Sequence, residues 1–529
     1  QNNTNNLSKF KTITEADLLK IIKTTNHNNT AGADEIPGKL ILHIKDQILK
    51  PLLNIINSSI QSNTVPTRLK TSLVYPKFKK SDKHNVENYR PIAILPTITK
   101  YLEKAIHKQI MDYLNSQNKL HIHQHGFRSN KSINTAIADL LNFITENWEK
   151  KQQVSAVFLD LRKAFDCLNW DILLKQLEDI GITKDANKWM ENYLTDRNQI
   201  VEIKSTYQSE NKQVRSQQKL MKNGVPQGSV LGPLLFLIYI NTLPSKLPTY
   251  SKCIMYADDT TLIIPGQNQH EIERRINSAV EITEKELISF NLKINHTKTY
   301  QINFTTKTTQ PTEQHNNNQI TTVNNTKFLG LELDNTLTWN KHTEQITKKL
   351  SSALYAIKRI KTIAGKKPAL TAYHSLMASH IRFGIIAWGG APHIYLEPIL
   401  ILQKKAIRII NDCEINTPCR ELFKKEQILT IISIYIYETI LYSIQDINNA
   451  RSAYHHHNTR RKEDIDLPYR RLKKSQDHPQ YIGTKFFNHL PKNIKSLTNN
   501  KTKFKQELIN FLSIHPCYTK QEFFLIDNK

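Results

Sequence analysis

The feature that most constrains the fold is KCIMYADDTTLII, residues 252–264, where two adjacent carboxylates separate two apolar runs. The runs on either side of Asp258 and Asp259 are rich in β-branched residues and predict two strands joined by a tight turn. Aspartate is common in turns, so a plain hairpin tip explains the pair. Two like charges at the edge of a core also make each other costly to ionise, and a bound divalent cation would remove that cost. A turn and a metal site are both compatible with this segment.

A third acid has a similar context. Asp160 ends the apolar segment VSAVFL and precedes a stretch that resembles the start of a helix. A strand end and a hairpin tip in one antiparallel sheet would gather the three carboxylates at one edge. Such a cluster suits two Mg²⁺ ions, or Mn²⁺, about 4 Å apart, which stabilise the attacking and leaving oxygens of an in-line displacement. Taken alone, an acid in the position of Asp160 is more commonly a strand-end or helix-cap residue.

Charge points toward a polyanionic partner. The 529 residues include 73 Lys and Arg against 47 Asp and Glu, a formal net charge of +26. This surplus favours nucleic acid first and an anionic membrane second. Lys, Asn and Ile are abundant while Gly is scarce, so a biased nucleotide composition is a second explanation for the lysine count.

Other features narrow the setting. The five cysteines are scattered, and none has the close Cys or His partners of a zinc knuckle, which favours a reducing compartment. The longest apolar run, Val230 to Ile240, falls well short of the ~20 residues of a membrane span. Because the chain opens with QNNTNN rather than with Met or a signal peptide, we expect a fragment or a piece of a longer polyprotein.

Hydrophobic periodicity predicts a mixed chain that becomes helical after about residue 340. Thr14 and Asp17 predict a capping box at the first helix. We expect two strands around a basic loop within 69–95, a short strand at 328–334, and helices at 98–114, 133–149, 270–290, 349–363, 370–383 and 399–410. Residues 451–529 hold 16 Lys and Arg against 7 Asp and Glu, and we expect them to form a basic helical segment.

An ordered series of motifs spans roughly residues 30–335. They are AGADEIP, NYRPIAIL, QHGFRSNKS, FLDLRKAFDCLNW, GVPQGSVLGPLLFLIYIN, YADDTTL, LKINHTKT and FLGLELD. In sequence and order they resemble the reverse transcriptases of non-LTR (LINE-type) retrotransposons, close to the jockey group. The chain departs from the family pattern at Ser81, Ile133 and Asn291, which bears on loop geometry and leaves the acidic residues untouched.

The resemblance implies an α+β right-hand polymerase whose palm carries an antiparallel sheet. The implied parts are an N-terminal extension (1–65) leading into fingers (66–153), a palm with fingers-type insertions (154–335), a helical thumb (336–450) and a basic C-terminal segment (451–529). The implied activity is RNA-directed DNA polymerisation, in which an RNA template directs extension of a DNA 3′-OH with Mg²⁺ and dNTPs. In the family the primer is nicked genomic target DNA, and the implied location is intracellular, in a cytoplasmic ribonucleoprotein and the nucleus.

Family roles transfer by motif position. Asp160 and Asp258 would be metal ligands, and Asp259 would complete the acidic site as a weaker ligand. Phe165 would lie beneath the nucleotide sugar and exclude a 2′-OH; an ordinary core phenylalanine is the alternative. Lys298 would protonate departing pyrophosphate or simply bind phosphate.

The remaining implied contacts involve the nucleotide, the template and the primer. Nucleotide binding would involve Arg90, Lys79, Lys80, Gln227, Gly228 and Tyr256. Gly126, Phe127 and Arg128 would contact the template backbone, and Phe328, Leu329 and Gly330 would support the primer end. A lysine run such as the one holding Lys79 and Lys80 also occurs in ordinary solvated loops.

Two other functions remain open at this point. A non-catalytic nucleic-acid-binding copy is disfavoured because all three aspartates are present. An RNA-copying RNA polymerase is disfavoured by Phe165, whose ring should obstruct ribonucleotides. The histidine run at 455–457 fits a solvated loop better than a metal site.

Overall fold

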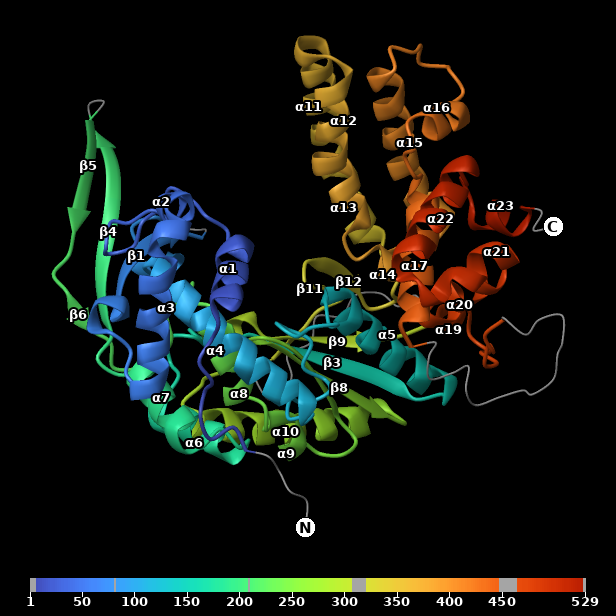
Figure 1. Cartoon of the computed structure of the whole chain (residues 1–529). Helices are drawn as coiled ribbons and strands as arrows, with labels where there is room; N and C mark the ends of the chain where they lie inside the picture. The colour runs from blue at the N-terminus through green and yellow to red at the C-terminus, as the bar shows by residue number, and fades with distance from the viewer. Residues whose placement is uncertain (1–5, 80–81, 208–209, 307–319, 447–463, 527–529) are drawn as a thin grey trace.

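The structure is a computed structural model that describes residues 6–79, 82–207, 210–306, 320–446 and 464–526. Its elements form a central sheet with flanking helices, an N-terminal lobe around a second sheet, and a C-terminal lobe built almost entirely of helices (Figure 1). The two lobes rise on opposite sides of the central sheet in this view. The mixed helix and strand content agrees with the α+β prediction.

The central sheet has the strand order β10-β9-β3-β8-β7. Its strands are β3 (Gln153–Leu159), β7 (Lys252–Tyr256), β8 (Asp259–Gly266), β9 (Tyr300–Phe304) and β10 (Thr321–Thr322). β3 lies in the middle, antiparallel to β8 and β9. Helix α5 (Ile133–Glu149) packs with one set of β3 side chains and α10 (Gln269–Ser289) lies in the core formed by the other set. Because both faces are covered, β3 is buried without interruption from Val154 to Leu159 instead of alternating between buried and exposed residues.

The N-terminal lobe surrounds the sheet β2-β1-β4-β5, with β6 also paired to β4. Its strands are β1 (Thr71–Phe78), β2 (Tyr89–Ile94), β4 (Asn198–Tyr207), β5 (Glu210–Arg215) and β6 (Lys219–Leu220). The predicted strand pair around the basic loop is the antiparallel pair β1–β2. The hairpin β4–β5 extends away from the body of the lobe (Figure 1).

The helices of this half of the chain pack on one another and share a hydrophobic core with one face of the central sheet. They are α1 (Glu15–Thr24), α2 (Gly38–His43), α3 (Lys45–Ser62), α4 (Thr97–Ser116), α6 (Trp170–Asp179), α7 (Lys184–Leu194), α8 (Leu231–Tyr239) and α9 (Leu243–Lys246). Short 3-10 turns occur at Thr67–Lys70, Val86–Asn88 and His296–Lys298. The predicted capping box is confirmed, since the Thr14 and Asp17 side chains bond each other's backbone N–H.

The C-terminal lobe follows the short hairpin β11 (Asn325–Phe328) and β12 (Leu331–Asp334). Its helices are α11 (Asn340–Ala364), α12 (Lys366–Ala372), α13 (Ser379–Arg382), α14 (Ile385–Trp388), α15 (His393–Ile410), α16 (Arg420–Lys425) and α17 (Ile431–Ser443), with the 3-10 turn Ile444–Asp446. Beyond residue 464 come α19 (Lys473–Gln476), α20 (Pro479–Asn488), α21 (Lys492–Lys495), the 3-10 turn Ser496–Asn499, α22 (Lys501–Ile514) and α23 (Lys520–Phe524). α20 and α22 pack directly on α17, so both parts share one hydrophobic core.

Two predicted elements differ from the structure. The strand predicted at 328–334 is interrupted: Phe328 ends β11, Leu329 and Gly330 form a turn with left-handed φ values of 47° and 91°, and only Leu331–Asp334 continue as strand β12. The helix predicted at 370–383 is divided by a π-helical stretch, Tyr373–Ala378, between α12 and α13. The helices predicted at 98–114, 133–149 and 270–290 match α4, α5 and α10 closely.

The structure also bears on the membrane alternative. Among the residues described, we find no helix with the length and apolar character needed to cross a bilayer. The apolar run that begins at Val230 forms the short buried helix α8.

Candidate active site

The acids predicted to be functional meet at one edge of the central sheet. β7 and β8 are joined by the two-residue turn Ala257-Asp258, and β8 begins at Asp259. Ala257 has φ of 55°, the left-handed backbone that a two-residue hairpin turn requires. The pairing of β3 with β8 sets the end of β3 beside the start of β8, and Asp160 is the first residue after β3. The hairpin tip and the strand end therefore bring the three carboxylates together.

Their electrostatic coupling shows how close these acids are. Burial raises the pKa of Asp258 above its usual value, and the negative charge of Asp160 raises it further. The positive charges of Arg90 and Lys79 act in the opposite direction. Asp259 is exposed, but the surrounding protein still removes part of its hydration, and with the two other carboxylates this raises its pKa to about 6. The edge concentrates negative charge that a cation would stabilise.

Asn295 and Lys298 follow α10 and approach the same edge. The Asn295 side-chain amide donates to Asp160 Oδ2 at 2.9 Å, and its backbone N–H donates to the Asp160 carbonyl at 2.8 Å. Lys298 Nζ lies 4.0 Å from Asp160 Oδ2, with 51% of its side chain exposed. Lys298 thus lies where an ammonium can meet a phosphate. Asn295 was not predicted, although it lies within the LKINHTKT motif.

The donor set fits a hard divalent cation. Carboxylate oxygens are ligands that Mg²⁺ and Mn²⁺ prefer. Within the described residues, no group of three or more His, Cys, Asp or Glu side chains is arranged to hold a metal ion, so there is no preformed cage of protein ligands. Magnesium keeps several waters and takes substrate phosphate oxygens as ligands, so it does not require such a cage. The charge of Asp160 raises the pKa of Asp258, so the two carboxylates lie within one electrostatic field.

Gln124 connects the acidic turn to the QHGFRSNKS segment. Its buried Oε1 accepts from the backbone N–H of Gly126 at 2.9 Å and of Ala257 at 3.2 Å. The same segment pairs with β7, since His125 N–H donates to the Met255 carbonyl at 2.8 Å. A Cβ on Gly126 would lie 2.5 Å from the Ala257 nitrogen, so only glycine permits this approach. Gly126, predicted to bind template, therefore also supports the turn that carries Asp258.

A buried ionic cluster lies behind this contact. Asp139 of α5 accepts from His123 Nδ1 at 3.1 Å and from Lys252 Nζ of β7 at 2.5 Å. His125 Nε2 lies 3.4 Å from Asp139, which is within ion-pair range but not aligned as a hydrogen bond. Burial alone would raise the pKa of Asp139, but the histidines and Lys252 hold it well below its usual range. Apart from the alternating histidines, no sequence pattern predicts this cluster, because its members come from three separate segments.

The GVPQGS loop lies against the loop that follows Asp160. Val225 N–H donates to the Phe165 carbonyl at 3.0 Å, and Gln227 Nε2 donates to Asp166 Oδ1 at 3.0 Å. Gly228 has φ of 134°, and a Cβ there would lie 2.4 Å from the Ala93 carbonyl oxygen of β2. The glycine thus allows this loop to pack on the N-terminal lobe.

The Phe165 ring is half-buried and lies 5.0 Å from the ring of Phe236 in α8. This contact fixes the ring while leaving part of it accessible. It accommodates both interpretations of Phe165, a sugar-contacting ring and a packing residue.

The basic residues predicted to grip phosphate lie on the β1–β2 pair. Arg90 is an exposed residue of β2, and both Arg90 and Lys79 are close enough to lower the pKa of Asp258. Tyr256, at the end of β7, is half-buried and pairs with Asp259. Lys80 lies outside the described residues, as does the histidine run at 455–457.

The other predicted nucleic-acid contacts divide into exposed and inward-facing groups. Phe127 is 53% exposed, whereas Arg128 is half-buried and donates to the His121 carbonyl at 2.7 Å. Phe328 is 5% exposed, and its ring lies 5.5 Å from that of Phe158 in β3. The turn Leu329-Gly330 connects β11 to β12, the last strand before the C-terminal lobe. Arg128 and Phe328 therefore have structural contacts besides any role with nucleic acid.

The backbone conformation of Asn291 accounts for an asparagine at a position where the family often has glycine. Its φ is 54°, a left-handed conformation that asparagine tolerates better than most residues. Its side-chain amide also donates to the Cys167 carbonyl at 3.0 Å.

Comparison with known proteins gives one family and several relatives. Residues 78–333 match the reverse transcriptase (RNA-dependent DNA polymerase) family. The chain is 26% identical, over 76% of its length and 45% of the relative's, to the probable RNA-directed DNA polymerase from transposon BS of Drosophila melanogaster. It is 24% identical to the probable X-element polymerase of the same organism, over 87% of the chain and 50% of that relative. It is 25% identical to the polymerase of mobile element jockey, over 75% of the chain and 44% of that relative. The chain spans about half the length of these relatives.

Proposed function

Residues 78–333 belong to the reverse transcriptases, in the branch of jockey-like non-LTR retrotransposon polymerases, and from this we propose that the chain extends a DNA 3′-OH on an RNA template. The observation that carries the proposal is the convergence of Asp160, Asp258 and Asp259 at one sheet edge, with coupled charges and with cationic side chains around them. The net charge of +26 supports polyanionic partners.

The three aspartates would hold divalent metal, with Asp259 the weaker ligand. Reverse transcriptases use divalent metal ions, and we propose two Mg²⁺ ions, which Mn²⁺ can replace. Bound there, the ions would favour the ionised primer 3′-OH and neutralise charge on the departing pyrophosphate. Asn295 would keep the Asp160 carboxylate oriented through its hydrogen bond. Lys298 would bind the leaving phosphates and supply a proton.

The incoming dNTP would lie between the acidic edge and the β1–β2 pair. Arg90, Lys79 and Lys80 would bind its triphosphate, and Phe165 would face its sugar. Gln227, Gly228 and Tyr256 would complete the nucleotide site. This proposal is supported by the positive charges of Arg90 and Lys79, which lower the pKa of Asp258 and so act directly on the acidic edge.

In this proposal the central sheet is the palm, the N-terminal lobe the fingers and the C-terminal lobe the thumb. The template strand would run past Gly126, Phe127 and Arg128, and the primer end would rest near Phe328, Leu329 and Gly330. The template would be the element's own RNA and the primer a nicked DNA target. We place this activity in a ribonucleoprotein of the cytoplasm and nucleus.

The test is extension of oligo(dT) on poly(rA) with Mg²⁺ and dTTP. We expect extension by the wild-type chain, and loss of roughly a thousandfold or more in the double variant Asp258→Ala/Asp259→Ala, since metal contributes several kcal/mol to such transfers. Asp179→Ala, an exposed change at the end of α6, is the control and should extend normally. Equal activity in the wild type and the double variant would overturn the proposal.

A further inference from the structure

The segment 470–478 lies between α5 of the central sheet and the base of the C-terminal lobe. Leu472 N–H donates to Glu149 Oε1 at 2.8 Å, and His478 Nε2 bonds the Ala138 carbonyl at 3.1 Å, so the segment is attached along α5. Immediately after it, α20 packs on α17 in the core of the C-terminal lobe. Residues well beyond the matched range 78–333 thus contact both α5 and the C-terminal lobe.

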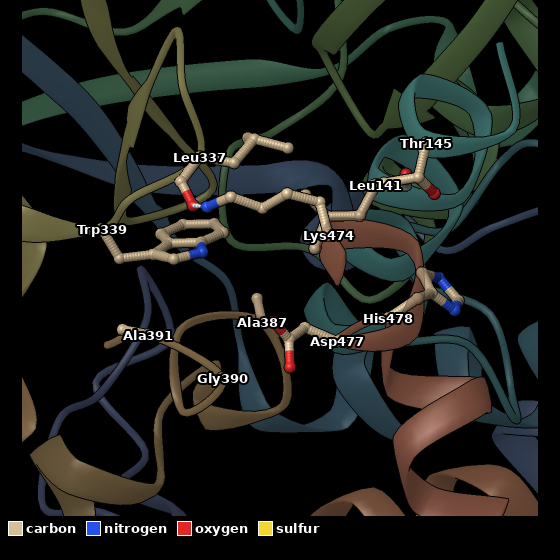
Figure 2. Close-up of a pocket in the computed structure, with 10 residues that line it drawn as sticks. All are labelled: Leu141, Thr145, Leu337, Trp339, Ala387, Gly390, Ala391, Lys474, Asp477 and His478. Atoms are coloured by element: carbon tan, nitrogen blue, oxygen red, sulfur yellow. Dashed lines mark hydrogen bonds between the residues drawn. The ribbon is translucent and has the colours of Figure 1, made fainter. Parts of the chain in front are cut away.

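Lys474 extends from this segment to the turn through which the chain enters the C-terminal lobe. Its ammonium donates to the Leu337 carbonyl, and its aliphatic chain lies near Trp339 (Figure 2). Burial lowers the pKa of Lys474, while the carboxylates of Asp334 and Asp477 oppose that change. The Leu337 carbonyl and the Asp334 carboxylate belong to the turn, and Asp477 belongs to the segment itself, so Lys474 links the turn to the segment.

The turn that Lys474 reaches is strained. Leu337 and Trp339 have φ of 53° and 66°, left-handed values that cost energy for residues with bulky side chains. The Asp334 carboxylate accepts from the N–H groups of Thr338 at 2.8 Å and Trp339 at 2.7 Å. Strained backbone persists where surrounding contacts hold it. Asp334 supplies local contacts, and Lys474 supplies one from a segment remote in sequence.

The turn connects β12 to α11, which begins one residue after Trp339, and so contributes to the direction of α11. α11 has 25 residues, and at 1.5 Å per residue it is roughly 37 Å long. A tilt of about 10° at its base would therefore move its far end by roughly 6 Å. A small change in the turn becomes a large change at the tip of the lobe.

We propose that Lys474 is a positioning residue that fixes the angle of α11 against the central sheet, so that the C-terminal segment sets how firmly the enzyme retains an RNA–DNA duplex during synthesis. This inference rests on the proposed polymerase function. It gives residues 470–478 a role in duplex retention that is separate from nucleotide addition. The groups that Lys474 contacts are Leu337, Asp334 and Asp477, none of which belongs to the acidic edge, so we expect addition of the first nucleotide to be unaffected.

The test compares Lys474→Met with a matched control, Lys495→Met. Lys495 is also a lysine of the C-terminal segment, 8% exposed in its side chain, and it bonds Asp464 at 2.8 Å without touching the turn. Product length is measured on an RNA template after a heparin trap allows a single binding event. We expect Lys474→Met to shorten products several-fold with an unchanged rate for the first nucleotide. Lys495→Met should lower the melting temperature and leave product length unchanged.

Hydrogen–deuterium exchange gives a readout independent of activity. In Lys474→Met the amides of Thr338 and Trp339 should exchange several-fold faster than in the wild type, while amides of β3 stay protected. If Lys474→Met does not fold, Lys474→Gln, which keeps an N–H donor on a shorter chain, takes its place.

The outcomes separate this inference from the proposed function. No extension by the wild type would overturn the polymerase proposal, whereas exchange at the turn would still report on Lys474. Wild-type product length together with wild-type exchange in the Lys474 variant would overturn the positioning role. The same losses in Lys495→Met would also overturn it, because they would show a general loss of stability.

Discussion

At the scale of single residues, the adjacent acids of the YADD motif are explained by their neighbours. Asp258 is in the turn and Asp259 starts the following strand, so the two adjacent side chains have different backbone environments. Burial and the charge of Asp160 raise the pKa of both acids, and the charge of Asp258 raises the pKa of Asp259 further. The pair is unfavourable for the protein alone, and this is the cost that a bound cation would offset.

Phe165 provides a residue-scale prediction on substrate choice. Phe165→Ala should raise incorporation of ribonucleotides relative to deoxynucleotides by roughly tenfold or more, because removing the ring opens space for a 2′-OH. The measurement is the ratio of kcat/KM for dTTP and UTP on one RNA template. The exposed Phe127, on the surface of the QHGF segment, is the phenylalanine to change as a control, and its replacement should leave the ratio unchanged. An unchanged ratio in Phe165→Ala would contradict a role of the ring in excluding the 2′-OH and would leave Phe165 as a packing residue.

Gln124 provides a second prediction at this scale. Gln124→Met removes the acceptor of the Gly126 and Ala257 N–H groups, and leaving such buried donors unpaired costs about 1–3 kcal/mol. We expect the turn to hold Asp258 less well, so the Mg²⁺ concentration for half-maximal activity should rise several-fold. Titration of activity with Mg²⁺ checks this.

Gln403→Met is the matched control for Gln124→Met. Gln403 is another fully buried glutamine, and it accepts from Ile431 N–H at 2.7 Å in the C-terminal lobe. This variant should lose stability without a change in its Mg²⁺ requirement. A normal Mg²⁺ requirement in Gln124→Met would contradict the role given to Gln124.

At the scale of elements, the sequence patterns predicted most long helices and the β7–β8 hairpin but not the turn at Leu329-Gly330. α4, α5 and α10 were predictable because each has a wide apolar face. The hairpin β11–β12 was missed because its first turn residue is Leu329, which seldom adopts a left-handed φ and gives no turn signal. Gln124, Asp139 and Asn295 were missed because their partners lie on other segments, and one sequence shows residue types but not contacts.

The start of α11 provides a prediction of pH dependence. His342 is 5% exposed between the rings of Trp339 and Trp388, and burial together with the charges of Lys349 and Lys327 lowers its pKa to about 4. The unfolded chain binds a proton near pH 6.5 that the folded chain does not accept until about pH 4. The stability linked to neutral His342 is therefore complete above pH 6.5 and is lost as pH falls toward 4.

The check is the melting temperature from pH 7.5 to 4.5 for the wild type and His342→Asn. Asparagine keeps an acceptor for the Glu332 N–H, which His342 Nδ1 accepts at 3.3 Å. The variant should melt lower at pH 7.5 but lose less on acidification. His374→Asn, at an exposed histidine of the same lobe, should follow the wild type. A parallel decline in His342→Asn and the wild type would contradict the assignment.

At the scale of the whole molecule, the C-terminal residues complete the lobe that follows the central sheet. α17 is buried on nearly all sides, and α20 and α22 supply much of its cover. A helix that is apolar all round is stable only inside a core. The sequence suggested a separate basic segment from residue 451, since charge is visible in a sequence whereas the packing of Phe486 and Phe504 is not. The acidic edge, in contrast, was predictable because its residues lie in contiguous motifs.

The central claim is that Asp160, from one strand, and Asp258, from a hairpin joined much later in the chain, act together in metal-dependent DNA synthesis on RNA. The most direct measurement is the single-turnover rate of dTTP addition to oligo(dT) on poly(rA) over a range of Mg²⁺ concentrations. We expect Asp160→Asn and Asp258→Asn each to reduce the rate by roughly a thousandfold, and the double variant to lose little more, because both serve one site. Asp179→Asn should behave as the wild type. A wild-type rate in either single variant, or synthesis that persists without divalent metal, would contradict the account.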